Sequence, residues 1–415
     1  MDMSARPTSS DTAWHGPLTG VKVVSLCQAI AGPFACSMLG DLGADVIGIE
    51  NPNGRDASRP GAHNPGWGTL MDRRNSRSLC MNIKSSEGKS LLAKLLSSSD
   101  MLIEGFRGGQ LAKWGLSDQE LWKINPALVI VHISGFGQTG LSSYVQRASF
   151  DGIGQAYSGF LEMNGFSDRP PLPAFPQVSD YYAGFMALTG GLAALHHAKK
   201  TGEGDSIDVA QFEAMLRCSG YYIMDYLNTK TLPARGVTFN AGMGTYICRD
   251  GVSLYVMVLG SGVLKHACAI LDLPYGSDLF PNGISGVRKD TEAGEALEAA
   301  LANYLQTHDA ETVEQEFLAS GIPCSRVYTF AMGEADPHYQ ARKTFTEWQN
   351  AYDDHSIRGV SVVPRLKKHP GKVRRGMPLV GQHNEEILKS MGLSSRENSC
   401  LYKRGILAKE STPQG

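Results

Sequence analysis

The feature that most constrains the fold is a repeated alternation of short apolar runs with helical patterns between residues 21 and 134. The apolar runs have the length and composition of buried strands, and they span residues 21–26, 45–50, 78–83, 101–104 and 128–134. Helical patterns at 34–42 and 86–96 separate some of them. Strands that alternate with helices indicate βαβ units and a parallel sheet. We therefore predict a doubly wound α/β domain, in which ligands bind beyond the carboxyl ends of the strands.

The chain has 415 residues, which is too long for one ordinary hydrophobic core. We predict that residues 1–227 and 381–415 together form the large α/β domain. A smaller α+β domain is expected at 243–339, with linkers at 228–242 and 340–380. Its signals are a hairpin with an Asp250-Gly251 turn and helical patterns, the latter at 261–271, 291–306 and 310–320.

Composition excludes several classes of partner and site. The net charge of −2 gives no sign of global electrostatic binding to nucleic acid or to a membrane surface. The eight cysteines form no C-x-x-C pair, which argues against a zinc site. No apolar run approaches the ~18 residues of a membrane span, and the N-terminus lacks the pattern of a signal peptide. We expect a cytoplasmic protein with reduced thiols and no bound metal.

Asp180 stands at a chemically notable place. It follows Pro173 and Pro176, which favour extended backbone, and it precedes an apolar run rich in small residues at 181–195. An Asp before such a run is a helix-start signal, so we predict a helix at 180–200 and a second one at 211–226. The local pattern alone favours a helix N-cap role for Asp180, and a nucleophilic carboxylate is the alternative.

Several segments in order and at matching spacing resemble the family III CoA-transferases, from Gly16 to Leu407. They are Gly32-Pro33 with 42–47, then 72–79, 105–109, 132–137, 201–210 and 381–388. Within the family, the resemblance is nearest to the carnitine CoA-transferase branch. The segments that carry this finer resemblance are 134–138, 173–176, 215–226, 347–349 and 375–378.

This resemblance implies that CoA is exchanged between two carboxylic acids through an aspartyl anhydride and an aspartyl-CoA thioester. The family's catalytic Asp falls on Asp180, and its CoA-contacting basic positions fall on Arg107 and Lys113; Arg74 is a further CoA-binding residue by expectation. The CoA thioester is then a substrate, and no tightly bound cofactor is expected. A free Asp has a pKa of about 3.9, so we expect Asp180 to be ionised at pH 7 without tuning.

The acids expected from the resemblance are carnitine, crotonobetaine and γ-butyrobetaine, whose ammonium groups favour aromatic faces such as Tyr181. A transferase for another acid, such as a dicarboxylate, is the main alternative. An α-methylacyl-CoA racemase would need a His before Asp151 to move a proton, and Phe150 stands there. A CoA binder that does not use Asp180 is a further alternative.

Members of the family form interlocked homodimers, and the two long linkers are compatible with that topology. We assign packing roles to His132 and to the pair His196-His197. Gly242 and Gly244 resemble a shortened active-site glycine loop, or else they belong to an ordinary turn.

Overall fold

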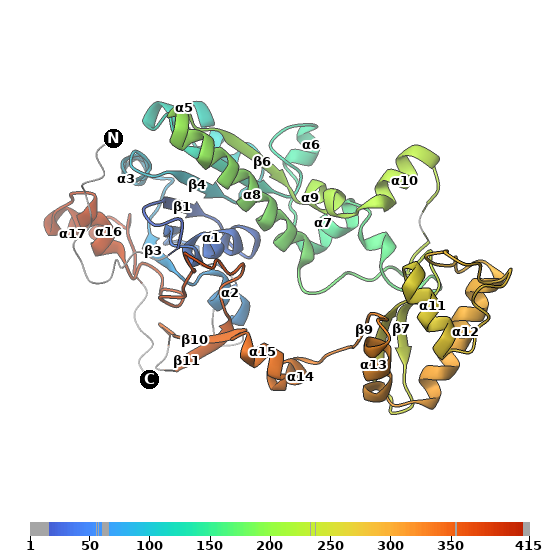
Figure 1. Cartoon of the computed structure of the whole chain (residues 1–415). Coiled ribbons are helices and arrows are strands. Elements are labelled where there is room, and N and C mark those ends of the chain that lie inside the picture. Colours follow the sequence, from blue (N-terminus) through green and yellow to red (C-terminus); the bar gives the residue numbers. More distant parts are fainter. Residues whose placement is uncertain are drawn as a thin grey trace. The chain divides into compact units, whose positions relative to one another are not determined.

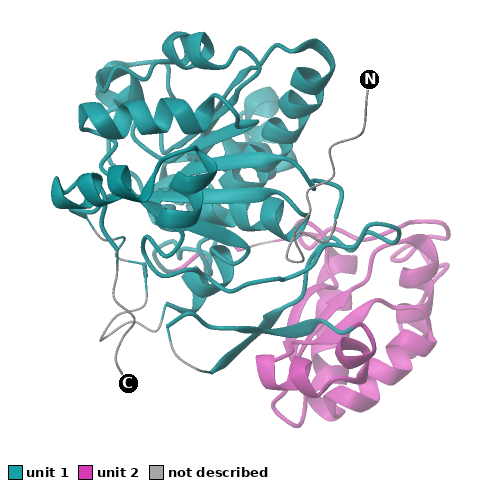
Figure 2. Ribbon diagram, turned by 90° about the vertical axis from the view of Figure 1, so that its left-hand side faces the viewer, with its two compact units in different colours: residues 1–165, 169–233, 343–415 teal, residues 166–168, 234–342 magenta. Residues whose placement is uncertain are grey.

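The computed structural model describes residues 16–54, 56, 58–59, 66–232, 234–236, 238–352 and 355–409. The chain forms two compact units (Figure 2). The larger unit takes in residues 1–165, 169–233 and 343–415, and the smaller one takes in 166–168 and 234–342. The larger unit thus includes 343–380, which the sequence analysis assigned to a linker.

A six-stranded parallel sheet forms the centre of the larger unit (Figure 1). Its strands are β1 (Lys22–Leu26), β2 (Asp45–Glu50), β3 (Ser76–Cys80), β4 (Met101–Glu104), β5 (Val129–Ser134) and β6 (Ser206–Ala210). Their order is β3-β2-β1-β4-β5-β6, and every neighbouring pair is parallel. The order reverses between β1 and β4, whose carboxyl ends therefore mark the usual ligand-binding edge of such sheets. The predicted doubly wound α/β fold is confirmed.

Helices cover both faces of this sheet. One face is covered by α1 (Ala31–Asp41) and the long helix α8 (Val178–Thr201). The opposite face is covered by α3 (Ser86–Leu96), α5 (Asp118–Ile124) and α16 (Asn384–Ser390). Each layer buries its own apolar cluster against the sheet, one centred on residues such as Val131 and Leu39, the other on residues such as Ile130 and Leu92. Each fully buried aliphatic side chain contributes roughly 1.5–3 kcal/mol.

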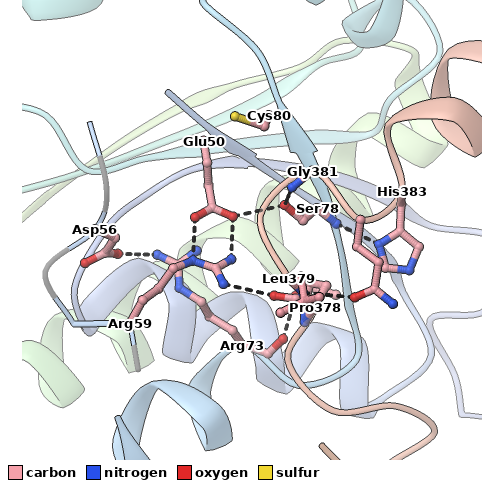
Figure 3. Close-up of polar contacts among 12 residues, drawn as sticks. Glu50, Asp56, Arg59, Arg73, Ser78, Cys80, Pro378, Leu379, Gly381 and His383 are labelled. Atoms are coloured by element: carbon pink, nitrogen blue, oxygen red, sulfur yellow. Dashed lines mark hydrogen bonds and ion pairs between the residues drawn. The ribbon is translucent and has the colours of Figure 1, made fainter. Parts of the chain in front are cut away.

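The C-terminal segment returns to the edge strand β3 through buried polar contacts (Figure 3). Arg59 pairs with Glu50 at 2.5 Å and also donates to the carbonyl of Pro378 at 2.9 Å. The Ser78 hydroxyl donates to Glu50 at 3.0 Å and accepts from the Gly381 N–H at 2.9 Å. These contacts join the C-terminal segment to the N-terminal part of the larger unit.

Three local predictions need correction. The helix expected at 211–226 is two helices, α9 (Gln211–Cys218) and α10 (Tyr221–Thr229), because Gly220 between them has a positive φ of 59°. The segment 340–380 contains a hairpin of β10 (Phe345–Gln349) and β11 (Ser356–Val360). Helix α17 (Ser395–Lys403), which begins with a Ser394–Glu397 capping box, was not foreseen.

The smaller unit contains an antiparallel sheet in the order β7-β8-β9. Its elements are β7 (Met243–Ile247), β8 (Ser253–Met257), α11 (Ser261–Ile270), α12 (Glu292–Thr307), α13 (Ala310–Ala319) and β9 (Cys324–Arg326). The predicted hairpin with Gly251 in its turn is confirmed. Gly244 lies inside β7 and Gly242 just before it, which favours an ordinary strand start over an active-site glycine loop.

The remaining short elements are α2 (Trp67–Asp72), α4 (Gln110–Lys113), α6 (Ser142–Val145), α7 (Asp151–Tyr157), η1 (Leu161–Met163), α14 (Phe330–Ala335) and α15 (Pro337–Ala341). Among the described residues, no helix is both long enough and apolar enough to cross a lipid bilayer.

Candidate functional site

Asp180 lies in the first turn of α8, not at its N-cap. The helix begins at Val178, two residues earlier than predicted, and Gln177 occupies the N-cap position. The Asp180 carboxylate accepts a hydrogen bond from the side-chain amide of Gln211, and the residue is only 8% exposed. The N-cap hypothesis is therefore wrong, and the carboxylate is free of a helix-capping role.

Helix α7 holds the first turn of α8 in place. The Ser179 N–H donates to Asp151 Oδ1 at 2.7 Å, and the Ser179 hydroxyl donates to the Asp151 carbonyl at 2.9 Å. The buried Gln155 donates to the other oxygen of Asp151 at 2.6 Å. A Cβ at Gly154 would lie 2.7 Å from the Ser179 hydroxyl, so the two helices meet closely at a glycine. The backbone that carries Asp180 is thus fixed by polar and steric contacts.

Gln211 gives the site a fixed hydrogen-bond donor. It is the first residue of α9, directly after β6, and it is buried. Its Oε1 accepts from the Ser149 hydroxyl at 2.8 Å, which leaves Nε2 to donate to Asp180. The sequence analysis selected neither Gln211 nor Ser149. The signal that could have found Gln211 is its place at the carboxyl end of a strand in a doubly wound fold.

The surroundings of Asp180 raise its pKa to about 7. Burial is the main cause, the negative charge of Asp151 adds to it, and the hydrogen bond from Gln211 partly opposes both. This raised pKa corrects the expectation of an ordinary Asp that needs no tuning. A carboxylate with a higher pKa is more basic and is a stronger nucleophile once ionised.

A second carboxyl group with a raised pKa lies beside Tyr181. Asp72 is 3% exposed, it accepts a hydrogen bond from the Tyr181 hydroxyl at 3.4 Å, and burial raises its pKa to about 7. The Tyr181 ring meets Phe34 edge to face at 4.9 Å between centroids, and Phe34 meets Phe185 at 5.0 Å. An acidic group and aromatic rings therefore adjoin the helix turn that carries Asp180.

The loop that follows β4, residues 105–109, presents Arg107 to solvent. Its peptide groups are held at three points: Phe106 N–H donates to Glu104 at 2.6 Å, the Gly108 carbonyl accepts from Gln146 at 2.9 Å, and Gly109 N–H donates to Gln138 at 2.9 Å. Arg107 and Lys113 are both exposed. Lys113, on the adjoining α4, donates to the other amide atom of Gln146 at 2.7 Å. These contacts fix the loop, which presents the exposed guanidinium of Arg107 at the ligand-binding edge of the sheet.

Arg74 lies elsewhere, in a buried ion pair. It bonds Asp41 at 2.5 Å, donates to the Val360 carbonyl at 2.6 Å, and lies over the Trp348 ring. These contacts give Arg74 a role in joining α1 to the β10–β11 hairpin. This geometry does not favour the prediction that Arg74 binds CoA.

The histidines differ from their predicted packing roles. His196 and His197 are exposed on α8, so that prediction is wrong for them. His132 is buried, as expected, but it contacts two carboxylates, Glu104 and Asp118. Within the described part of the chain, no group of three or more His, Cys, Asp or Glu side chains is arranged to hold a metal ion.

Comparisons with known proteins identify the family of this chain. The sequence profile of the CoA-transferase family III matches residues 18–384. The chain is 37% identical over 399 residues to the bile acid CoA-transferase BaiK of Clostridium scindens, which covers 95% of this chain and 90% of that protein. Similar solved structures are a CAIB/BAIF family protein from Brucella suis (TM-score 0.76, 26% identity, 91% of this chain and 100% of that chain) and Rv3272 from M. tuberculosis (TM-score 0.78, 23% identity, 90% and 100%). The chain belongs to the family III CoA-transferases.

Proposed function

We propose that this protein moves CoA between two carboxylic acids and that Asp180 is its nucleophile. The observation that carries the proposal is the environment of Asp180: a buried carboxylate with a pKa near neutrality, held by Gln211 on a fixed helix turn. Membership of a CoA-transferase family supplies the reaction class. A racemase is disfavoured because the side chain of Phe150, before Asp151, cannot transfer a proton.

The proposed reaction passes through two covalent intermediates on Asp180. Its carboxylate oxygen attacks the carbonyl carbon of the donor acyl-CoA, the CoA thiolate leaves, and a mixed anhydride remains. The thiolate then attacks the Asp180 carbonyl, which releases the donor acid and forms an aspartyl-CoA thioester. The acceptor carboxylate attacks this thioester and displaces the CoA thiolate, which forms a second mixed anhydride. The thiolate then attacks the acyl carbon of the acceptor in this anhydride, which yields the product thioester and frees the Asp180 carboxylate. Backbone or side-chain N–H groups near Asp180, with Gln211 as the nearest donor, stabilise the oxyanions.

Arg107 and Lys113 are proposed to bind the phosphate groups of CoA. Both side chains are exposed near the carboxyl end of β4. Guanidinium and ammonium groups are the usual partners of phosphates. CoA is a substrate in this proposal, and no tightly bound cofactor takes part.

The acids of the reaction remain a choice between two classes. Carnitine-type acids carry a quaternary ammonium, and the half-buried ring of Tyr181, next to Asp180 in the sequence, offers an aromatic face for such a cation. The 37% identity to a bile acid CoA-transferase instead favours a steroid acid. A dicarboxylate is a weaker alternative, because neither observation supports it.

We also propose that the enzyme is a cytoplasmic homodimer whose two chains interlock. Helix α10 supports the dimer: it contains Tyr221, Met224 and Leu227, which are 56%, 58% and 55% exposed, and none of its residues is buried in the single chain. Exposed apolar surface of this kind marks a protein interface. All eight cysteines are free, as expected in a reducing compartment.

Intact-mass spectrometry tests the proposed function. The protein is mixed in turn with crotonobetainyl-CoA, a bile acyl-CoA and succinyl-CoA, each with and without a second acid of the same class. We expect a CoA-sized adduct that maps to Asp180, and product thioester only when the second acid is present. The donor that gives turnover identifies the acid class.

The control is Asp180→Asn, which keeps the shape of the side chain and an acceptor for Gln211 but cannot form the anhydride. It should give neither adduct nor product with any donor. An adduct on another residue, or turnover by Asp180→Asn, would refute the assignment of Asp180.

A further inference from the structure

His132 forms a buried bridge between two carboxylates at the edge of the sheet where the strands end. It is 5% exposed; its Nδ1 lies 2.6 Å from Glu104 Oε1, and its Nε2 lies 3.1 Å from Asp118 Oδ1. Glu104 and His132 are register partners on the parallel strands β4 and β5, so their side chains share one face. The proposed mechanism makes no use of this cluster.

The bridge is connected to the loop that carries Arg107. Glu104 is the last residue of β4, and its second oxygen accepts the Phe106 N–H at 2.6 Å. On the other side of His132, Asp118 is the first residue of α5. His132 therefore connects the start of the 105–109 loop to the start of α5.

The two carboxylates around His132 favour a protonated imidazole. Glu104 faces it from β4 and Asp118 from α5, while Asp208, its register partner on β6, points to the Gln138 N–H. A neutral imidazole donates one hydrogen bond, whereas imidazolium donates two. Burial alone would lower the pKa of His132, but its hydrogen bonds to Asp118 and Glu104 prevail and raise it to about 9. At neutral pH both carboxylates therefore keep a donor.

We propose that imidazolium His132 is a positioning residue for CoA: by holding Glu104, it fixes the loop that presents Arg107. The inference rests on the proposed function, in which Arg107 binds CoA. When His132 loses its proton, one carboxylate loses its donor, and a buried acceptor without a partner destabilises the local arrangement. CoA affinity should therefore fall as the pH rises through about 9, with little change in the chemical step at Asp180.

The test measures CoA binding and turnover in His132→Gln, which is neutral at every pH. We expect the Kd for CoA, measured by calorimetry at pH 7.5, to rise roughly tenfold, the effect of one lost buried hydrogen bond. The KM for acyl-CoA should rise similarly while kcat changes less than twofold. In the wild type the Kd should increase from pH 8 to 9.5, and in His132→Gln it should be flat.

Asp118→Asn separates this proposal from a purely structural role. It replaces a charged acceptor of His132 by a neutral one and so weakens the interaction that contributes most to raising the pKa of His132; the alkaline increase in Kd should therefore move to lower pH. A structural defect would instead weaken binding equally at all pH values. His197→Gln, at an exposed position on α8, is the matched control and should behave as the wild type.

The outcomes distinguish this inference from the proposed function. If wild-type protein binds CoA and forms the Asp180 adduct, but His132→Gln has an unchanged Kd, or loses kcat alone, the positioning role is wrong and the function stands. If the wild type binds no CoA and forms no adduct, the proposed function fails first. Circular dichroism of each variant at pH 7.5 and 9.5 shows whether a change in affinity is simply unfolding.

Discussion

At the scale of single residues, Asp180 combines a buried position with a side chain that must become charged to react. Asp151 both fixes the Ser179 peptide and raises the pKa of Asp180 through its negative charge. The same residue therefore places the nucleophile and increases its basicity. Gln211 acts in the opposite direction, since its hydrogen bond favours the ionised form.

The first prediction follows from that balance. The rate of CoA-adduct formation, measured in single-turnover mixing with an acyl-CoA donor, should increase with pH and reach half of its maximum near pH 7, because only ionised Asp180 attacks. In Asp151→Asn the midpoint should move to lower pH, since a negative charge is lost while an oxygen remains to accept from Ser179. The maximal rate should also fall, because a less basic carboxylate is a weaker nucleophile.

Glu213→Gln is the control for loss of charge alone. Glu213 is exposed and lies on α9, two residues from Gln211. In Glu213→Gln, the pH at which adduct formation reaches half of its maximal rate should equal that of the wild type. A rate that does not vary between pH 5.5 and 8.5 would show that Asp180 titrates like an ordinary Asp, and the account of its environment would be wrong.

The sequence located Asp180 but could not describe its surroundings. Asp180 was found because a helix-start signal coincided with a family motif, both of which are local in the sequence. Gln211 and Asp151 are 31 and 29 residues away from Asp180 in the sequence. They lie beside the first turn of α8 only because β6 ends there and α7 begins there. Likewise, the pattern of charges around Arg74 contained no sign that Asp41 would pair with it.

At the scale of elements, the contact between α1 and α8 depends on a glycine. A Cβ at Gly184 would lie 2.7 Å from Phe34 Cδ1 and 2.8 Å from the Ala31 carbonyl oxygen. Gly184 is one helical turn beyond Asp180, so the same contact sets the distance between α1 and the turn that carries the nucleophile.

The second prediction is that Gly184→Ala destabilises the fold and slows the reaction. The two helices must separate or distort, at a cost of roughly 1–3 kcal/mol in the free energy of unfolding. Displacement of the turn that carries Asp180 should lower kcat as well. Denaturant unfolding and steady-state kinetics measure the two effects.

Gly68→Ala provides the comparison. Gly68 lies in helix α2, and a Cβ there would meet no atom within 4 Å. Replacing a helical glycine by alanine without a clash stabilises by roughly 0.5–1 kcal/mol. If both variants have the same stability, then α1 and α8 are less tightly packed than the structure indicates.

Helices and strands with strong periodic patterns could be predicted from the sequence. The division of one helix into two and the β10–β11 hairpin could not. The strands β2 and β4 and the helix α3 have the predicted bounds, because each is an apolar run or stripe with clear turn signals on both sides. Gly220 divides α9 from α10 without interrupting the apolar pattern around it. The β10–β11 hairpin precedes a run of prolines and basic residues at 364–375, and its Trp348 and Ile357 pack in a small cluster with Leu70, which is far away in the sequence.

At the scale of the whole molecule, helix α10 carries the observation on which the proposed homodimer rests. Leu227 of α10 and Leu318 of α13 are 55% and 54% exposed, but α13 buries other residues such as Phe317, whereas α10 buries none. An apolar helix without a buried face is unstable in water, because most helical stability comes from packing. A second copy of the chain is the proposed cover.

The third prediction is that the protein is a dimer whose two chains associate during folding and do not exchange afterwards. Light scattering after gel filtration should give twice the 44.8 kDa of one chain. Because interlocked chains separate only by unfolding, two differently tagged preparations mixed after folding should not exchange subunits over a day. Brief denaturation of the mixture followed by refolding should produce the mixed dimer.

Two charge substitutions connect that dimer to α10. Leu227→Glu should lower the yield of dimer or the midpoint of thermal unfolding, because a carboxylate would be buried at the interface. Leu318→Glu, at a leucine of equal exposure on a helix with its own packed face, should leave both unchanged. A monomer in solution would refute the dimer outright. A dimer that exchanges subunits freely would keep the interface and refute the interlocking, and a Leu227→Glu protein as stable as the wild type would move the interface away from α10.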